Sequence, residues 1–119
     1  MKIRQIMDLL EAECVTGEFL LDKDVDMAFG CDLMSDVLAF ANEKTLLLTG
    51  LINPQVIRTV EMLDIKVIVF VRGKKPDAQV IALAERNNII LLSTKHILYT
   101  ACGILHAHGL KGVPSRREG

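Results

Sequence analysis

Apolar residues along the chain recur with two different periods, which separate predicted helices from predicted strands. Near the start they recur at the spacing of one helical face, at Ile3, Ile6, Met7 and Leu10. This spacing predicts a short amphipathic helix over 2–11. A loop containing Gly17 follows. Over 25–31, apolar residues alternate with polar or small ones, and this period of two predicts a strand towards a sheet edge.

From residue 46 onward, continuous apolar runs alternate with helical periods. The runs begin at Leu46, Val67 and Ile89, and their nearly equal spacing is the length of one strand, one helix and two short loops. Four further helices are predicted after the one over 2–11: one after a cap at Asp32, one opened by Asn53 and Pro54, one after Asp77, and one from about Thr94 to Ala107. Right-handed crossovers between such units make the strands parallel.

The predicted fold class is therefore α/β, a three-layer domain with a mainly parallel sheet built from βα units. A chain of 119 residues rarely divides into two cores, so we expect one domain over 1–110. The segment 111–119 contains Gly112, Pro114 and several charged residues, which predicts a flexible tail.

Composition narrows the classes of function. Half of the residues are hydrophobic, the net charge is −1 and the pI is about 6.3, so no basic field favours nucleic acid or an anionic membrane. The first residues carry charges, and no uncharged run reaches the roughly 18 apolar residues of a membrane span. We therefore expect a cytoplasmic protein that binds neither nucleic acid nor membrane. The three cysteines lack C-x-x-C spacing, which fits reduced thiols.

Polar residues follow the predicted strands at their carboxyl ends, where ligands gather in open parallel sheets. The candidate ligand-binding residues are Thr49, Gly50, Asn53, Arg72, Gly73, Lys74, Lys75, Asp77, Ser93 and Thr94. Helix N-termini and cations together predict a nucleotide or another phosphate-bearing small molecule. The alternative is that Asn53, Ser93 and Thr94 only cap helices and that the glycines only ease turns. Arg72 is the strongest candidate, because a buried run places it directly at a strand exit.

Other groups of polar residues are weaker candidates for a functional site. Cys102 and His106 stand one helical turn apart with His108 beyond, which could offer metal ligands, but a buried thiol beside helix-end imidazoles explains them as well. Asp32 and Asp36 are explained by a helix N-terminus. Ser93 and His96 lack a partner acid. We therefore predict no catalytic residues, no metal site and no cofactor.

Four segments carry a resemblance to a known family. Residues 46–57, 67–77 and 90–94 resemble the strand-end motifs of the DRTGG domain family, and 30–39 resembles a segment of its small stand-alone members. Gly73, Lys75, Pro76 and Asp77 match one motif, in which Val71 and Arg72 replace Thr and Gly. Gly50 matches the Gly of a Gly-Asp-Arg turn, whose other two positions are occupied by Leu51 and Ile52. The resemblance spans 1–107.

The resemblance implies the fold of the N-terminal domain of the HPr kinase/phosphatase and a bacterial, cytoplasmic, regulatory role. Such domains accompany enzymes without being their catalytic parts. Two functions are therefore predicted. The first is a homodimeric regulatory module that senses a nucleotide or other small anion. The second is a dimerisation module that docks to a partner enzyme and needs no ligand, because so apolar a small chain has surface area to bury.

Overall fold

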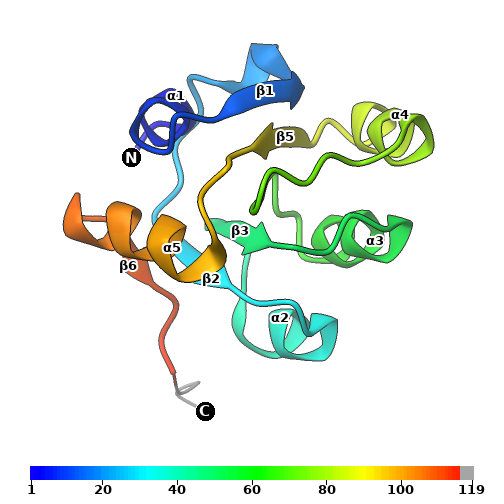
Figure 1. The fold of residues 1–119 in the computed structure, drawn as a ribbon. Coiled ribbons are helices and arrows are strands. Elements are labelled where there is room, and N and C mark those ends of the chain that lie inside the picture. Colours follow the sequence, from blue (N-terminus) through cyan, green and yellow to red (C-terminus); the bar gives the residue numbers. More distant parts are fainter. Residues whose placement is uncertain (116–119) are drawn as a thin grey trace.

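The computed structural model describes residues 1–115, which form one sheet between two layers of helices (Figure 1). In chain order the elements are α1 (Ile3–Leu9), β1 (Glu13–Thr16), the 3-10 helix η1 (Glu18–Leu20), β2 (Met27–Gly30), α2 (Met34–Phe40), β3 (Thr45–Thr49), α3 (Pro54–Met62), β4 (Val67–Phe70), α4 (Ala78–Arg86), β5 (Ile90–Ser93), α5 (Leu98–Ala107) and β6 (Lys111–Gly112).

The sheet has six strands in the order β1-β5-β4-β3-β2-β6. Strands β2 to β5 are parallel neighbours, β6 is parallel to β2, and β1 is antiparallel to β5. The predicted α/β class with a mainly parallel sheet is confirmed. The strand predicted over 25–31 is also part of this sheet, as β2.

The three central strands β3, β4 and β5 are buried along their whole length. Their side chains alternate between two apolar layers: Leu46 and Leu48 pack towards α1 and α5, whereas Leu47 packs towards α2, α3 and α4. Because both faces are covered by helices, these strands are continuous apolar runs in the sequence rather than alternating ones.

Helices α2, α3 and α4 cover one face of the sheet, and α1 and α5 cover the other (Figure 1). The connection through α5 is unlike the others. It runs from β5 near one edge to β6 at the opposite edge, whereas each of α2, α3 and α4 joins two adjacent strands. Within the described residues, no helix is long and apolar enough to cross a membrane.

Two of the predicted helix starts are confirmed. The Asn53 side chain accepts a hydrogen bond from the Val56 amide at 3.3 Å, with Pro54 in the first turn of α3. Asp77 likewise accepts from the Val80 amide at 3.0 Å at the start of α4. These capping bonds occupy backbone amides that the sequence had suggested as hydrogen-bond donors to a ligand.

Two other predicted caps are wrong. Helix α5 begins at Leu98 rather than near Thr94, and the Thr94 hydroxyl instead donates to the Leu10 carbonyl at 2.7 Å. Helix α2 has Leu33 at its N-cap position, and Asp32 caps nothing there. In both cases a polar side chain bonds to a distant segment that its neighbours in the sequence do not reveal.

Two short strands were not predicted. β1 lies in the segment interpreted as a loop around Gly17, and β6 lies at the start of the predicted tail. Lys111 and Gly112 pair with Met27 and Ala28, so a flexible tail beginning at 111 is corrected at these two residues. Residues 113–115 follow β6 outside any helix or strand, and the rest of the predicted tail, 116–119, lies outside the described residues.

Candidate functional site

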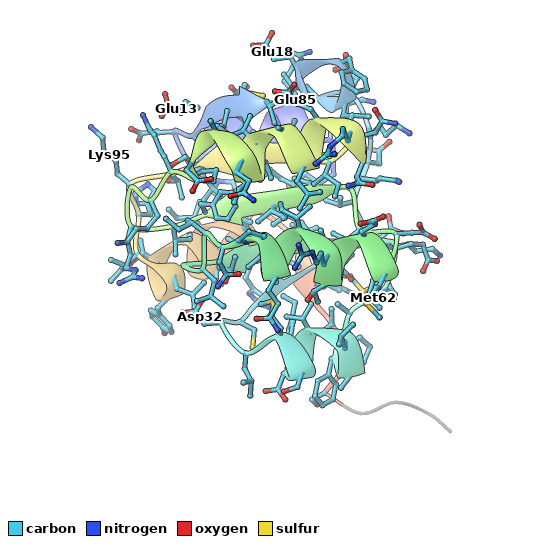
Figure 2. The ribbon with its side chains drawn as sticks, turned by 90° about the vertical axis from the view of Figure 1, so that its right-hand side faces the viewer. Glu13, Glu18, Asp32, Met62, Glu85 and Lys95 are labelled. Carbon is cyan, nitrogen blue, oxygen red and sulfur yellow. The ribbon has the colours of Figure 1, made fainter. Side chains whose placement is uncertain are left out.

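The carboxyl ends of β2, β3, β4 and β5 form one edge of the molecule. Parallel register places the ends side by side, with Thr49 opposite Phe70 and Phe70 opposite Ser93. In Figure 2 this edge is on the left, where Asp32 and Lys95 are labelled, and Met62 marks the opposite end. Every residue of the predicted ligand-binding set lies in or next to the loops of this strand-end edge, although they do not all face one point.

The amide of Gly50 already has an anionic partner within the protein. Asp32, just after β2, accepts hydrogen bonds through Oδ1 from the Thr49 hydroxyl and from the Gly50 amide, each at 2.8 Å. Thr49 and Gly50 are buried, whereas Asp32 is exposed. The donors predicted to hold a ligand anion are thus bound to a carboxylate of the chain itself, which also fastens the exit of β2 to that of β3.

Arg72 lies against Gly50. A methyl group added at Gly50 would come within 2.7 Å of Arg72 Nη2, so the absence of a side chain makes room for the guanidinium. The Arg72 backbone has φ of 61°, a conformation that costs a non-glycine residue energy, and its amide donates to the His96 carbonyl at 2.9 Å. Among the described residues, the guanidinium has no ion-pair partner.

The loop after Arg72 is tied to the exit of β5. The Gly73 amide donates to the Thr94 carbonyl at 2.9 Å, and the Ser93 hydroxyl donates to the Lys74 carbonyl at 2.8 Å. These bonds hold the backbone of 72–74 in place, while the side chain of Lys74 is exposed. A rigid loop therefore presents Arg72 beside the exit of β3 and leaves Lys74 exposed near the exit of β5.

The remaining residues of the predicted set have structural partners. Asn53 and Asp77 cap α3 and α4. Lys75 forms an ion pair with Glu13 of β1. Ser93 and Thr94 are buried and donate to backbone carbonyls. The arrangement therefore reduces the candidate anion site to Arg72 against the Gly50 turn, with Lys74 as a second exposed cation in the same loop.

Some of the residues considered for catalysis or metal binding have other hydrogen-bond partners. The Ser93 hydroxyl donates to a backbone carbonyl rather than to His96. His108 Nδ1 lies 2.8 Å from the Ile104 carbonyl. Burial raises the pKa of the Cys102 thiol, which favours its protonated form at neutral pH. Among residues 1–115, no three His, Cys, Asp or Glu side chains are grouped so as to hold a metal ion.

Two contacts of this edge were missed from the sequence. The bond between Asp32 and Gly50 joins residues 18 apart, and only the parallel pairing of β2 with β3 brings them together. The contact of Arg72 with Gly50 depends in the same way on β3 pairing with β4. A glycine directly after a buried run was the one available signal that another group approaches closely there.

With this geometry established, the chain can be compared with known proteins. The family model described as the DRTGG domain matches residues 5–108. The chain belongs to the DRTGG domain family. This match confirms the resemblance, over nearly the same range as the predicted 1–107. None of the curated proteins matches this DRTGG domain significantly.

A solved structure shares the fold. The CBS and DRTGG domains of the regulatory region of Clostridium perfringens pyrophosphatase, complexed with the activator diadenosine tetraphosphate, match with a TM-score of 0.67 and 18% identity. The match covers 87% of this DRTGG domain and 45% of that chain, so the present sequence spans less than half of the other protein's length. In that protein, a DRTGG domain is part of the regulatory region of an enzyme.

Proposed function

We propose that this DRTGG domain is a non-catalytic regulatory module that binds a nucleotide or another small anionic molecule at its strand-end edge. The observation that carries the proposal is the Arg72 guanidinium, which a rigid loop holds against Gly50 without an ion-pair partner among the described residues. A cation that is positioned but unpaired is available to an anion that arrives from solvent.

The surroundings of Arg72 favour a phosphate over a simple ion. A planar guanidinium offers a fork of donors that matches two phosphate oxygens at once. Lys74 is exposed two residues away and supplies a second charge. Because Asp32 occupies the Gly50 amide, the anion in this proposal is held by side chains rather than by the turn itself.

Comparison supports the same class of ligand. The pyrophosphatase regulatory region that shares this fold is described in complex with a dinucleotide activator. From that protein we transfer only a general property to this proposal: its DRTGG domain belongs to a regulatory region that is complexed with a nucleotide activator. Homodimerisation, a partner enzyme and a cytoplasmic location remain part of the proposal.

The test is a thermal-shift and calorimetric titration with ATP, AMP, diadenosine tetraphosphate and inorganic phosphate. A molecule that binds only the native state at about a hundredfold excess over Kd stabilises it by about 2.7 kcal/mol. Arg72→Gln should abolish the shift. Lys44→Gln is the matched control, because it removes the same charge from an exposed residue at the opposite end of the sheet, just before β3. Equal loss in both variants would point to a general charge effect and contradict a site at Arg72.

A second function is favoured by exposed apolar side chains. Tyr99, Met62 and Leu33 are 87%, 74% and 58% exposed. Such residues suit a ligand-free module that dimerises or docks to an enzyme. Light scattering at micromolar concentration, combined with the titration, separates the two proposals: a dimer that responds to none of the four phosphate compounds supports the second, and a dimer that binds one of them supports the first.

A further inference from the structure

A cavity of about 730 Å³ opens at the outer edge of β2, between α2, α5 and the residues that follow β6. Figure 1 shows α2 and α5 on either side of β2. No residue of the predicted strand-end set lines this cavity, so it is separate from the Arg72 site. Its volume lies within the range of pockets that bury small molecules.

Aromatic rings from three elements line the cavity: Phe29 of β2, Phe40 of α2 and Tyr99 of α5. The Phe29 and Phe40 rings have centroids 6.1 Å apart and are tilted by 49°, so they do not stack fully on each other. Tyr99 is exposed and contributes a ring with a polar tip. Flat ligands gain binding energy by stacking on such faces.

One stretch of the cavity wall is β2 backbone that has no strand partner among the described residues. β6 pairs only with Met27 and Ala28, and the Val113 amide donates to the Ala28 carbonyl at 3.1 Å. Since backbone groups alternate in direction along a strand, the amide and carbonyl of Gly30 point to the same outer edge, beyond the end of β6. Gly30 lines the cavity and offers one donor and one acceptor side by side. The edge of a heteroaromatic ring such as adenine presents the complementary pair.

The charges of the described lining of the cavity disfavour a phosphate. The described lining contains the carboxylate Asp36 and the imidazole of His106, but no Lys or Arg. A phosphate group would lose its hydration without gaining a permanent cation, and Asp36 would repel it. A neutral ring has no charge to desolvate and is not repelled by Asp36.

We infer that this cavity binds a neutral, planar heteroaromatic molecule with the chemistry of a nucleobase or nucleoside. The rings supply stacking, the Gly30 edge supplies directional hydrogen bonds, and the lack of Lys and Arg among the described lining residues selects against phosphorylated forms. The site differs from the proposed anion site in residues and in charge preference, so either can fail without the other.

Gly103 provides a variant that blocks the cavity without disturbing the core. It lies on the face of α5 that lines the cavity, and an added Cβ would meet no heavy atom within 4 Å. Gly103→Leu should fill the space between Tyr99 and His106. Gly103→Ala is the matched control, since it makes the same glycine replacement in the helix but adds only one methyl group.

Tyr99 provides the probe, because it is the single tyrosine of the chain. Incorporation of 3-fluorotyrosine therefore gives one ¹⁹F resonance, located at the cavity. Titration with adenosine should shift this resonance to saturation, and AMP should bind at least about tenfold more weakly. Gly103→Leu should remove the adenosine response, Gly103→Ala should retain it, and Arg72→Gln should leave it unchanged.

Three results would overturn the inference. The first is a resonance unmoved by millimolar adenosine in the unmodified chain. The second is an equal response in Gly103→Leu, which would place adenosine elsewhere. The third is a resonance that depends on protein concentration rather than on adenosine, together with a lower mass of Gly103→Leu by light scattering; the cavity would then hold a second copy of this chain.

Discussion

The two edges of the sheet are closed in different ways. At the β5 edge, β1 adds four residues in antiparallel register with one irregularity. Side chains reinforce this pairing: Glu13 forms an ion pair with Lys75, the Thr16 hydroxyl donates to Glu85 at 3.3 Å, and the Thr94 hydroxyl donates to the Leu10 carbonyl. The bonds join β1 and its flanks to α4, to the loop before α4 and to the exit of β5.

At the β2 edge, β6 contributes only two residues, and the cavity lies where pairing stops. An unpaired strand edge is a surface on which other molecules can pair, and proteins normally cover it. The contrast indicates that one edge of this DRTGG domain serves stability, whereas the other keeps its surface available. Substitutions at each edge should therefore differ in cost.

The largest effect is expected at the closed edge. Gly17 has φ of 89°, and a methyl group there would lie 2.7 Å from the Cα of Ile90 in β5. Gly17→Ala forces a buried strand to move and adds backbone strain, so we expect a loss of about 3 kcal/mol in the free energy of unfolding. Urea denaturation measures this loss.

Gly73→Ala is the control for Gly17→Ala. Gly73 has φ of 67°, but a methyl group there meets nothing within 4 Å. The loss in the free energy of unfolding of Gly73→Ala should come from backbone strain alone, about 1 kcal/mol. Equal losses in the two variants would show that packing against β5 contributes nothing.

The next effect concerns the bond that holds the exit of β2 to the sheet. Asp32→Ala leaves the buried Thr49 hydroxyl and Gly50 amide without their acceptor, and we expect a loss of about 2 kcal/mol. Asp32→Asn keeps an acceptor oxygen and should lose less. Because Asn also removes a negative charge near Arg72, phosphate compounds should bind it more tightly, which calorimetry would detect. Unchanged stability in Asp32→Ala would contradict the role of this bond.

A smaller cost is expected at the open edge. A methyl group at Gly30 would lie 2.6 Å from Cys102 Sγ and 3.2 Å from Leu98 Cδ1, both of which are side-chain atoms that can shift. Gly30→Ala should therefore cost about 1 kcal/mol. Adding Cys102→Ala should make room and reduce the cost, and a double-mutant cycle measures this coupling. Additive effects would mean that contact with the Cys102 thiol does not cause the loss of stability in Gly30→Ala.

The smallest effect is a dependence on pH near α1. The hydrogen bond and charge of Arg4 lower the pKa of the Asp22 carboxyl. The pair therefore contributes stability above the ordinary aspartate pKa of about 3.9, and the contribution disappears as the pH falls through the lowered value. Both side chains are largely exposed, so the contribution is small. Urea midpoints measured against pH should fall less steeply on acidification in Asp22→Asn than in the unmodified chain; identical profiles would contradict this linkage.

The parts of the fold that could be predicted are those whose signals are local. The central strands are continuous apolar runs, and α3 and α4 begin at Asn53 and Asp77, whose side chains cap amides three residues on. The strands β1 and β6 could not be predicted. They contain only four and two residues, of mixed polarity, and these residues become strands only by pairing with β5 and β2, which are distant in the sequence.

The candidate site was predictable in place but not in detail. Parallel strands bring their carboxyl ends together whatever the side chains are, so the strand-end edge follows from the fold class. The partners of its residues do not. Thr94 was interpreted as a cap, yet its hydroxyl bonds to Leu10, which is 84 residues away in the chain.

The long crossover through α5 has a consequence for how the protein is made. One face of the sheet is covered by the first and the last helix, so the side chains of Leu46, Val69 and Leu92 stay partly uncovered until Ala101 and Leu105 have been synthesised. The strands β2 to β5 and their three helices are complete earlier on the emerging chain. During translation, the growing chain thus carries an apolar face that α1 covers only in part until α5 has emerged.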